Sequence, residues 1–183
     1  MIKPTMTRWL LLGVSSFVCA CHITVGSGDG SQHSSPNRTG CGPGAIATCE
    51  QKCQAGDGHV CAIFGGMYAN GDGVAADQRR ASELFQKSCD AKFGPGCFVL
   101  GIRYGFGNGL PQDDALATAA YRRACEYGDG AGCESAGKAY LAGGRVPKDE
   151  KLGTELCQRA AQLGRKDPCK EALERKAQRG GTR

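Results

Sequence analysis

The stretch CQAGDGHVC, residues 53–61, places two cysteines eight positions apart with a glycine-rich turn between them. The same arrangement returns as CDAKFGPGC at 89–97 and as CEYGDGAGC at 125–133, each time 36 residues further along the chain. Self-similarity at a fixed period of a few tens of residues is typical of repeat proteins, in which each unit is one small supersecondary structure. The chain is therefore divided into units of 36 residues.

Each unit begins with a cysteine, a glycine four residues later and a tyrosine three residues after that. Positions 0, 4 and 7 fall on one stripe of a helix. A glycine on that stripe allows a neighbouring helix to approach closely, and the tyrosine covers the next turn. In chain order the three sets are Cys61, Gly65 and Tyr68; Cys97, Gly101 and Tyr104; and Cys133, Gly137 and Tyr140.

A glycine-rich loop follows each tyrosine and ends in an aspartate, which predicts the N-cap of a second helix. Each unit is thus a helix hairpin, and because a single hairpin cannot bury its apolar face alone, such units stack into a solenoid. The predicted N-caps are Asp77, Asp113 and Asp149, and the predicted inward residues of the second helices are Ala81, Leu84, Phe85 and Ser88, then Ala117, Ala120, Tyr121 and Ala124.

The cysteine brackets join consecutive units, since one cysteine ends a second helix and its partner begins the next first helix. Gly56 and Gly128 suit the left-handed turn between them. Closing so short a loop contributes about 2.5 kcal/mol on the chain-entropy model. At the last bracket Ala161 stands where a cysteine is expected, and Cys157 lies one turn earlier. The predicted pairs are Cys41–Cys49, Cys53–Cys61, Cys89–Cys97, Cys125–Cys133 and Cys157–Cys169.

A zinc site is the alternative for these cysteines. The gap of seven residues is not the short spacing of structural zinc ligands, and His22 and His33 lie outside the repeats. We expect neither a metal nor another cofactor.

Residues 1–20 have the pattern of an export signal: Lys3 and Arg8 precede an apolar run at 9–18 that is too short to span a bilayer, and small residues follow. The junction at Cys21 resembles the lipobox of bacterial lipoproteins, in which that cysteine is lipidated. Plain secretion, with Cys21 incidental, is the alternative. Residues 21–40 are rich in glycine and serine and are expected to form a flexible tether.

Export into an oxidising compartment accounts for the twelve cysteines of this 183-residue chain. Removing Cys19 with the signal and assigning Cys21 to lipid leaves ten, an even number for five disulfides. His22 in place of an acidic residue favours an outer-membrane lipoprotein, with a periplasmic or secreted protein as the alternative. A formal net charge of +5 is too small to indicate a nucleic-acid partner.

The predicted organisation is an all-α chain with one repeat array. Solenoid ends require polar caps, and the basic C-terminal segment fits that role. The segments are a signal peptide at 1–20, a lipidated tether at 21–40, and a solenoid at 41–179, which contains a partial repeat at 41–57, repeats at 58–93, 94–129 and 130–165, and a capping helix at 167–179; a disordered tail at 180–183 completes the chain.

The loops resemble those of the Sel-one-like repeat, a relative of the tetratricopeptide repeat, over about residues 45–179. The cysteine brackets make the chain similar to bacterial secreted cysteine-rich proteins of that family. The resemblance implies a right-handed α-solenoid whose concave face binds peptides or partner proteins, although the third loop departs from the pattern at Gly144 and Arg145. The residues that carry it are Tyr68, Gly71, Gly73, Val74 and Asp77, with Tyr104, Gly107, Gly109, Leu110, Pro111 and Asp113.

The same resemblance raises a hydrolase as the alternative function, because some cysteine-rich members are described as penicillin-binding proteins or weak β-lactamases. Ser135 and Lys138 match the S-x-x-K motif of serine β-lactamases, but no S-D-N or K-T-G accompanies them. His59 is the only histidine within the repeats. We expect a non-enzymatic interaction module that is a monomer in the cell envelope.

The face opposite the cysteine–glycine–tyrosine stripe is the predicted partner-binding surface. Exposed apolar side chains there are typical of interaction sites, with an unselected outer face as the alternative. Arg103 and Phe106 of the central repeat are the expected anchors and are predicted to face solvent. The full predicted set is Met67, Asn70, Ile102, Arg103, Phe106 and Lys138.

Overall fold

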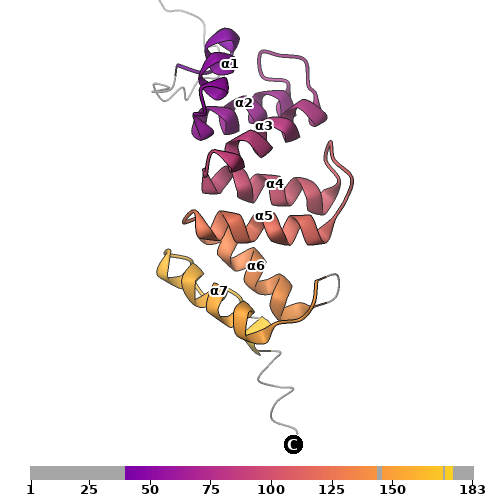
Figure 1. The fold of residues 1–183 in the computed structure, drawn as a ribbon, viewed down its shortest axis with the longest axis vertical. Coiled ribbons are helices and arrows are strands. Elements are labelled where there is room, and N and C mark those ends of the chain that lie inside the picture. The colour runs from indigo at the N-terminus through magenta and orange to yellow at the C-terminus, as the bar shows by residue number, and fades with distance from the viewer. Residues whose placement is uncertain (1–39, 144–145, 171, 175–183) are drawn as a thin grey trace, which may run out of the picture. The chain divides into compact units, whose positions relative to one another are not determined.

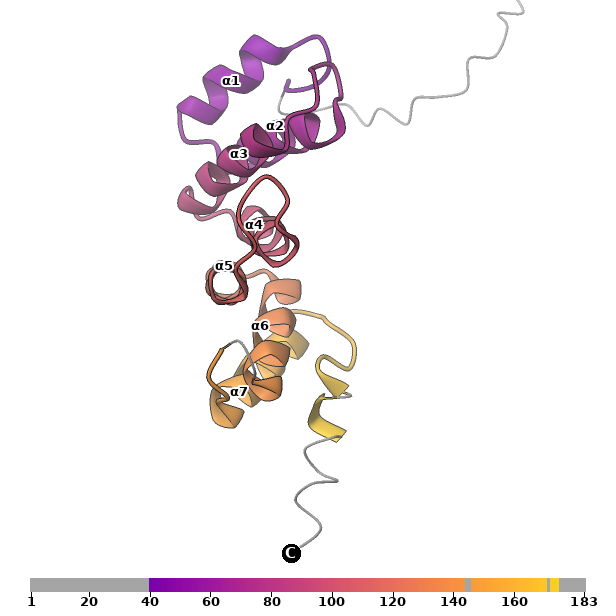
Figure 2. The same cartoon turned by 90° about the vertical axis from the view of Figure 1, so that its right-hand side faces the viewer.

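The computed structural model describes residues 40–143, 146–170 and 172–174, which form helices and connecting turns without a β-strand. The helices are stacked in chain order (Figure 1), and a view turned by 90° looks along α4 and α5 (Figure 2). They are α1 (Ile46–Gln54), α2 (Gly58–Asn70), α3 (Gln78–Asp90), α4 (Gly94–Phe106), α5 (Asp114–Glu126), α6 (Gly130–Ala142) and α7 (Glu150–Gln162).

The predicted helix hairpins of 36 residues are confirmed. The helices α2, α4 and α6 begin at Gly58, Gly94 and Gly130, and α1 is the second helix of the partial repeat. The predicted signal peptide, the lipidation site Cys21 and the tether lie outside the described residues, and the predicted capping helix lies partly outside them. No helix of the described residues is long and apolar enough to cross a membrane.

The glycine of each first helix permits the close packing within a hairpin that the stripe predicted. A Cβ atom at Gly101 would lie 2.5 Å from the ring of Tyr121, and one at Gly137 would lie 3.0 Å from the backbone oxygen of Gly153. At Gly65 the backbone oxygen of Ala81 and the ring of Phe85 would each be 3.2 Å away. A larger residue at any of these positions would push the two helices apart.

Aspartates cap five of the helices. The predicted caps Asp77, Asp113 and Asp149 each accept a hydrogen bond from a backbone N–H three residues later. Asp57 and Asp129 cap α2 and α6 in the same way, although the sequence analysis did not identify them. These bonds satisfy N–H groups that have no partner within the helix.

All five predicted disulfides are present. Three of them connect the end of α1, α3 or α5 to the start of the next helix, across the turns at Gly56, Lys92 and Gly128. These three residues have φ angles of +90°, +61° and +84°. Lys92 therefore adopts a conformation that favours glycine at the two equivalent turns.

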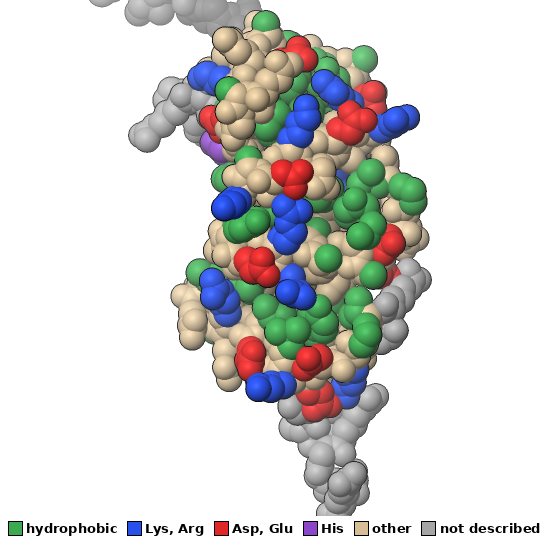
Figure 3. All heavy atoms as spheres, in the orientation of Figure 1, with side chains coloured by type: hydrophobic (Ala, Val, Ile, Leu, Met, Phe, Trp, Pro, Cys, Tyr) green, Lys and Arg blue, Asp and Glu red, His purple; other side chains and the backbone are tan. Residues whose placement is uncertain are grey.

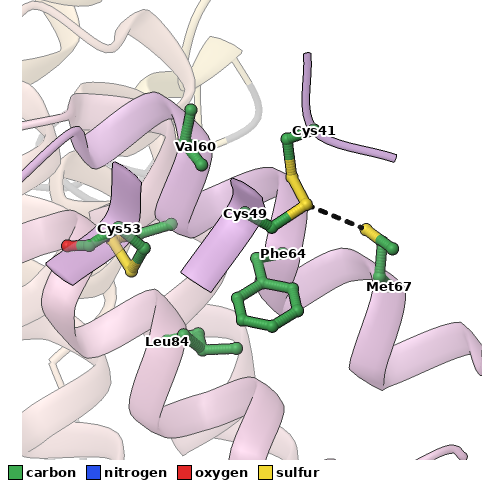
Figure 4. Packing of buried hydrophobic residues seen from close by; sticks show 8 residues of the cluster. Cys41, Cys49, Cys53, Val60, Phe64, Met67 and Leu84 are labelled. Carbon is green, nitrogen blue, oxygen red and sulfur yellow. Dashed lines mark hydrogen bonds between the residues drawn. A yellow bond between two sulfur atoms is a disulfide. The ribbon is translucent and has the colours of Figure 1, made fainter. Parts of the chain in front are cut away.

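The core at the N-terminal end contains much sulfur (Figure 4). The disulfide between Cys41 and Cys49 lies beside Phe64 and Met67, and Met67 Sδ is 4.0 Å from Cys49 Sγ. Polarizable sulfur fills an irregular space between α1 and α2 here. The disulfides are thus part of the apolar core as well as covalent links between units.

Candidate functional site

Two of the predicted partner-binding residues are buried. Met67 and Arg103 are only 4% and 5% exposed, so the prediction that Arg103 faces solvent is wrong, and Met67 is buried as well. A first helix in a solenoid packs against the second helix of its own unit and also against that of the preceding unit. Met67 and Arg103 lie on this second interface. The sequence analysis predicted only one buried stripe on each first helix, so it did not predict this interface.

The remaining members of that set lie at or near the surface but do not converge. Phe106 is 75% exposed, Ile102 is half-buried, and Asn70 is exposed and donates a hydrogen bond to Asp72. Lys138 is exposed and forms an ion pair with Glu134 at 2.6 Å. Of the six predicted residues, Phe106 alone lines the hollow described below.

Arg103 is held at the α3–α4 junction by acceptors on α3. Its Nε donates to Ser82 Oγ at 2.6 Å, and its Nη2 donates to the backbone oxygen and the side-chain Oε1 of Gln78 at 2.7 and 2.9 Å. The guanidinium carbon lies 5.6 Å from the centroid of the Phe85 ring. Burial lowers the pKa of Arg103. The guanidinium thus fills this junction and joins two repeats.

The α5–α6 junction contains a hollow of about 470 Å³. Figure 3 shows hydrophobic side chains gathered over α6 and near the α4–α5 connection. The hollow is predominantly apolar, with a carboxylate, a threonine hydroxyl and a tyrosine among its walls. It is lined by Gly105 and Phe106 of α4, Asp114, Ala117, Thr118 and Tyr121 of α5, Ala139 of α6, and Gly143 and Val146 of the segment that follows.

The polar groups of the hollow are arranged along α5. Thr118 Oγ1 donates to the backbone oxygen of Asp114 at 2.8 Å. Burial raises the pKa of Tyr121, and the negative charge of Asp114 raises it further. Sequence reasoning identified Ala117 and Tyr121 as inward packing residues of α5 and missed Asp114 and Thr118. The available signal was one position of the first helices, which Met67, Arg103 and Ala139 occupy in successive repeats. The side chain there is large in the first two repeats and small in the third.

The S-x-x-K pair lies on α6. Ser135 is half-buried, and Lys138 is engaged by Glu134, which also accepts from Arg165 at 2.7 Å. Burial raises the pKa of Glu134, but the hydrogen bonds from Lys138 and Arg165 outweigh it, so the pKa is lowered overall. Lys138 is therefore engaged in an ion pair with Glu134. The described residues contain no cluster of three or more potential metal ligands.

The comparisons with known proteins agree with the repeat boundaries. The model of the Sel1 repeat matches residues 64–93, 94–129 and 131–164. No curated protein matches the chain in sequence.

Three similar solved structures cover about two thirds of the chain. The chain spans half of the first, about a quarter of the second and most of the third. They are a Sel1 repeat protein from Oxalobacter formigenes (26% identity, TM-score 0.60, 67% of this chain and 50% of that chain), a protective antigen of uropathogenic Escherichia coli with an SLR fold (28%, 0.60, 66% and 26%), and cysteine rich protein B of Helicobacter pylori (27%, 0.55, 69% and 90%). With the family's repeat matched three times on the hairpins and disulfide-linked junctions described above, the chain belongs to the Sel1 repeat family.

Proposed function

We propose that the protein is an exported, lipid-anchored scaffold of the outer membrane that binds a protein or peptide partner through Phe106 and the adjacent α5–α6 hollow. Sel1 repeat proteins generally mediate protein–protein interactions. The observation that carries the proposal is the position of Phe106, which is 75% exposed at the edge of the hollow.

An exposed phenylalanine beside a concave apolar surface favours a binding role. Isolated exposed apolar residues are common on protein surfaces, but a large aromatic side chain next to a hollow offers a partner both area and shape. Aromatic residues are enriched in the centres of interfaces. The hollow also has the size of typical ligand sites, roughly 300–1,000 Å³.

Export and lipidation rest on the sequence pattern at 1–21 and on the five disulfides. Disulfides persist in oxidising compartments, and reduction in the cytosol would remove them. The lipid would anchor the chain, and residues 22–40 would connect the anchor to the repeats.

Site-specific photo-cross-linking in the producing cells tests the interaction. A photoreactive phenylalanine replaces Phe106 in the full chain, and Leu116 is the matched control because it is 47% exposed on α5 without lining the hollow. Cross-linking at 106 to one discrete envelope protein, and not at 116, is expected. Equal products at both positions, or none at 106, would overturn the proposed surface.

Membrane fractionation tests the anchor separately. The Cys21→Ser chain should move from the membrane to the soluble fraction, because it lacks the thiol that would carry the lipid. Cys19→Ser is the control and should remain with the membrane. If Cys21→Ser stays with the membrane, the lipid anchor is wrong.

A further inference from the structure

We propose that Asn108 and Gly109, in the α4–α5 connection, form a self-modifying site at which the side-chain amide of Asn108 is lost as ammonia. The products are aspartate and isoaspartate, and water is the only co-reactant. The inference does not depend on the proposed partner surface, although the loop follows Phe106. It comes from comparing the places where an asparagine precedes a glycine in the described part of the chain, Asn70–Gly71 and Asn108–Gly109.

The reaction uses the backbone nitrogen of the glycine as its nucleophile. The nitrogen of Gly109 loses its proton to hydroxide and attacks Cγ of Asn108, the bond from Cγ to the amide nitrogen breaks, and ammonia leaves after taking a proton from water. A cyclic succinimide results. Water then opens the ring at Cγ, which gives aspartate, or at the backbone carbonyl carbon, which gives isoaspartate with the chain continuing through Cβ. Glycine has no Cβ to obstruct the attack.

Asn70 is protected by the end of α2. It is the last residue of that helix, and the N–H of Gly71 donates to the backbone oxygen of Met67 at 2.8 Å. The side-chain amide of Asn70 donates to Asp72 at 3.2 Å, which places a carboxylate beside the reacting groups. Attack by the Gly71 nitrogen would break a hydrogen bond of the helix cap and would create a negative nitrogen near that carboxylate.

Asn108 lies beyond the end of α4, in the loop. The cap of α4 uses the N–H groups of Gly107 and of Asn108 itself, and both donate to the backbone oxygen of Arg103. The N–H that would react is the next one, that of Gly109, which forms no hydrogen bond with the described residues. Asn108 is exposed, so the attack does not require a helix to open.

The preceding repeat shows which product the loop can accept. One unit earlier, Asp72 and Gly73 occupy the positions of Asn108 and Gly109. The N–H of Asp72 closes the cap of α2 in the same way as the N–H of Asn108 closes the cap of α4. The aspartate product is therefore compatible with this loop.

Isoaspartate differs from aspartate because it inserts a methylene into the backbone. Gly109 packs on the start of α3, where an added Cβ would overlap the backbone oxygen of Gln78. That oxygen accepts from Arg103 at 2.7 Å, and the backbone oxygen of Asn108 accepts from Ser82 at 2.8 Å. The added methylene should push the loop away from these groups and loosen the α3–α4 junction.

The test follows the conversion of amide to acid in the full, oxidised chain by peptide mass spectrometry, at neutral and at mildly alkaline pH. We expect Asn108 to be converted at least tenfold faster than Asn70, at a rate that rises with pH because hydroxide removes the proton of Gly109. The reduced chain in guanidinium is the control. Both asparagines precede a glycine, so their rates in the unfolded chain should agree within about twofold.

Three results would overturn the proposal. They are equal rates for Asn70 and Asn108 in the folded chain, faster conversion of Asn70, and no conversion of Asn108 over a time that converts the unfolded chain.

Two substitutions separate the position in the loop from the composition of the pair. Asp72→Asn puts the same pair into the first loop and should create a site that reacts within about threefold of Asn108. An inert position 72 in this variant would contradict the role of the loop. Asn108→Asp removes the reactive amide and should have the urea midpoint of the unaltered chain, because Asp72 occupies the equivalent position. A lowered midpoint would contradict the equivalence of the two loops.

Urea unfolding of the converted chain tests the effect on the junction. Ion exchange separates converted from unaltered chains by their added negative charge, and peptide fragmentation measures how much isoaspartate they contain. The converted chains should unfold at a lower urea concentration than Asn108→Asp, since they differ from it only in their isoaspartate. Equal midpoints would overturn the loosening of the α3–α4 junction.

Discussion

The α3–α4 and α5–α6 junctions are formed by equivalent helices of successive repeats, but a side chain fills the first junction and the second contains a hollow. In the first, Arg103 fills the space between two repeats with a guanidinium that bonds Ser82 and Gln78. In the second, Ala139 leaves a hollow of about 470 Å³. The α1–α2 junction uses a third solution, in which Met67 packs on the disulfide of Cys49.

This difference shows that neighbouring junctions of one repeat protein can be filled or open. Each repeat contacts only its neighbours, so stability is close to a sum of local terms. A junction that is covalently closed by a disulfide, such as that of Cys125 and Cys133, can lack an internal filler while adjacent junctions remain packed.

The largest effect is expected from emptying the filled junction. Arg103→Ala should lower the free energy of unfolding by about 3 kcal/mol, because it removes several hydrogen bonds to a charged group and leaves a cavity. Urea unfolding under oxidising conditions measures this change. Arg79→Ala is the control, since the side chain of Arg79 is 84% exposed and its ion pair should contribute less than about 1 kcal/mol. Equal small losses in both variants would show that Arg103 does not support the junction.

Two glycines of α4 sharpen the comparison because one faces a packed helix and the other faces the hollow. Gly101→Ala should destabilise the protein by about 2 kcal/mol, since the new Cβ would lie 2.5 Å from the ring of Tyr121. Gly105→Ala should stabilise it by about 0.5–1 kcal/mol, because its Cβ meets only Ala117 at 3.9 Å and alanine favours a helix. Thermal melting of the two variants measures both signs. Destabilisation by Gly105→Ala would mean that the hollow is not open at this edge.

The paired hydroxyls give the smallest expected difference. Ser82→Ala should cost about 1.5 kcal/mol, because Ser82 accepts from the buried Arg103 and also bonds the backbone oxygen of Asn108 at 2.8 Å. Thr118→Ala should change stability by less than about 0.5 kcal/mol, since the hydroxyl of Thr118 donates to a backbone oxygen of its own helix and alanine is a better helix former. Urea unfolding of both variants is the measurement, and equal costs would contradict the difference between the junctions.

The sequence predicted the features that depend on local spacing. The cysteine brackets, the hairpin period and the caps at Asp77, Asp113 and Asp149 follow from short-range geometry, and all are present. The exposure of Arg103 was predicted wrongly, because it depends on which neighbouring helix faces it across the junction.

The hollow required a different comparison. An alanine at position 139 is unremarkable by itself, and its meaning comes from the residues that surround Arg103 one repeat earlier. From the sequence alone, Thr118 and Tyr121 are each compatible with an ordinary packed helix. Their shared position along the wall of the hollow is set by contacts between repeats.

The most direct test of the account is a crystal structure of the Ala139→Arg chain. The account predicts that the new guanidinium enters the hollow, donates to Thr118 Oγ1 and lies against the ring of Tyr121, as Arg103 does with Ser82 and Phe85. An arginine that instead turns into solvent, with the hollow left open between α5 and α6, would show that the two junctions are not equivalent and would contradict the central claim.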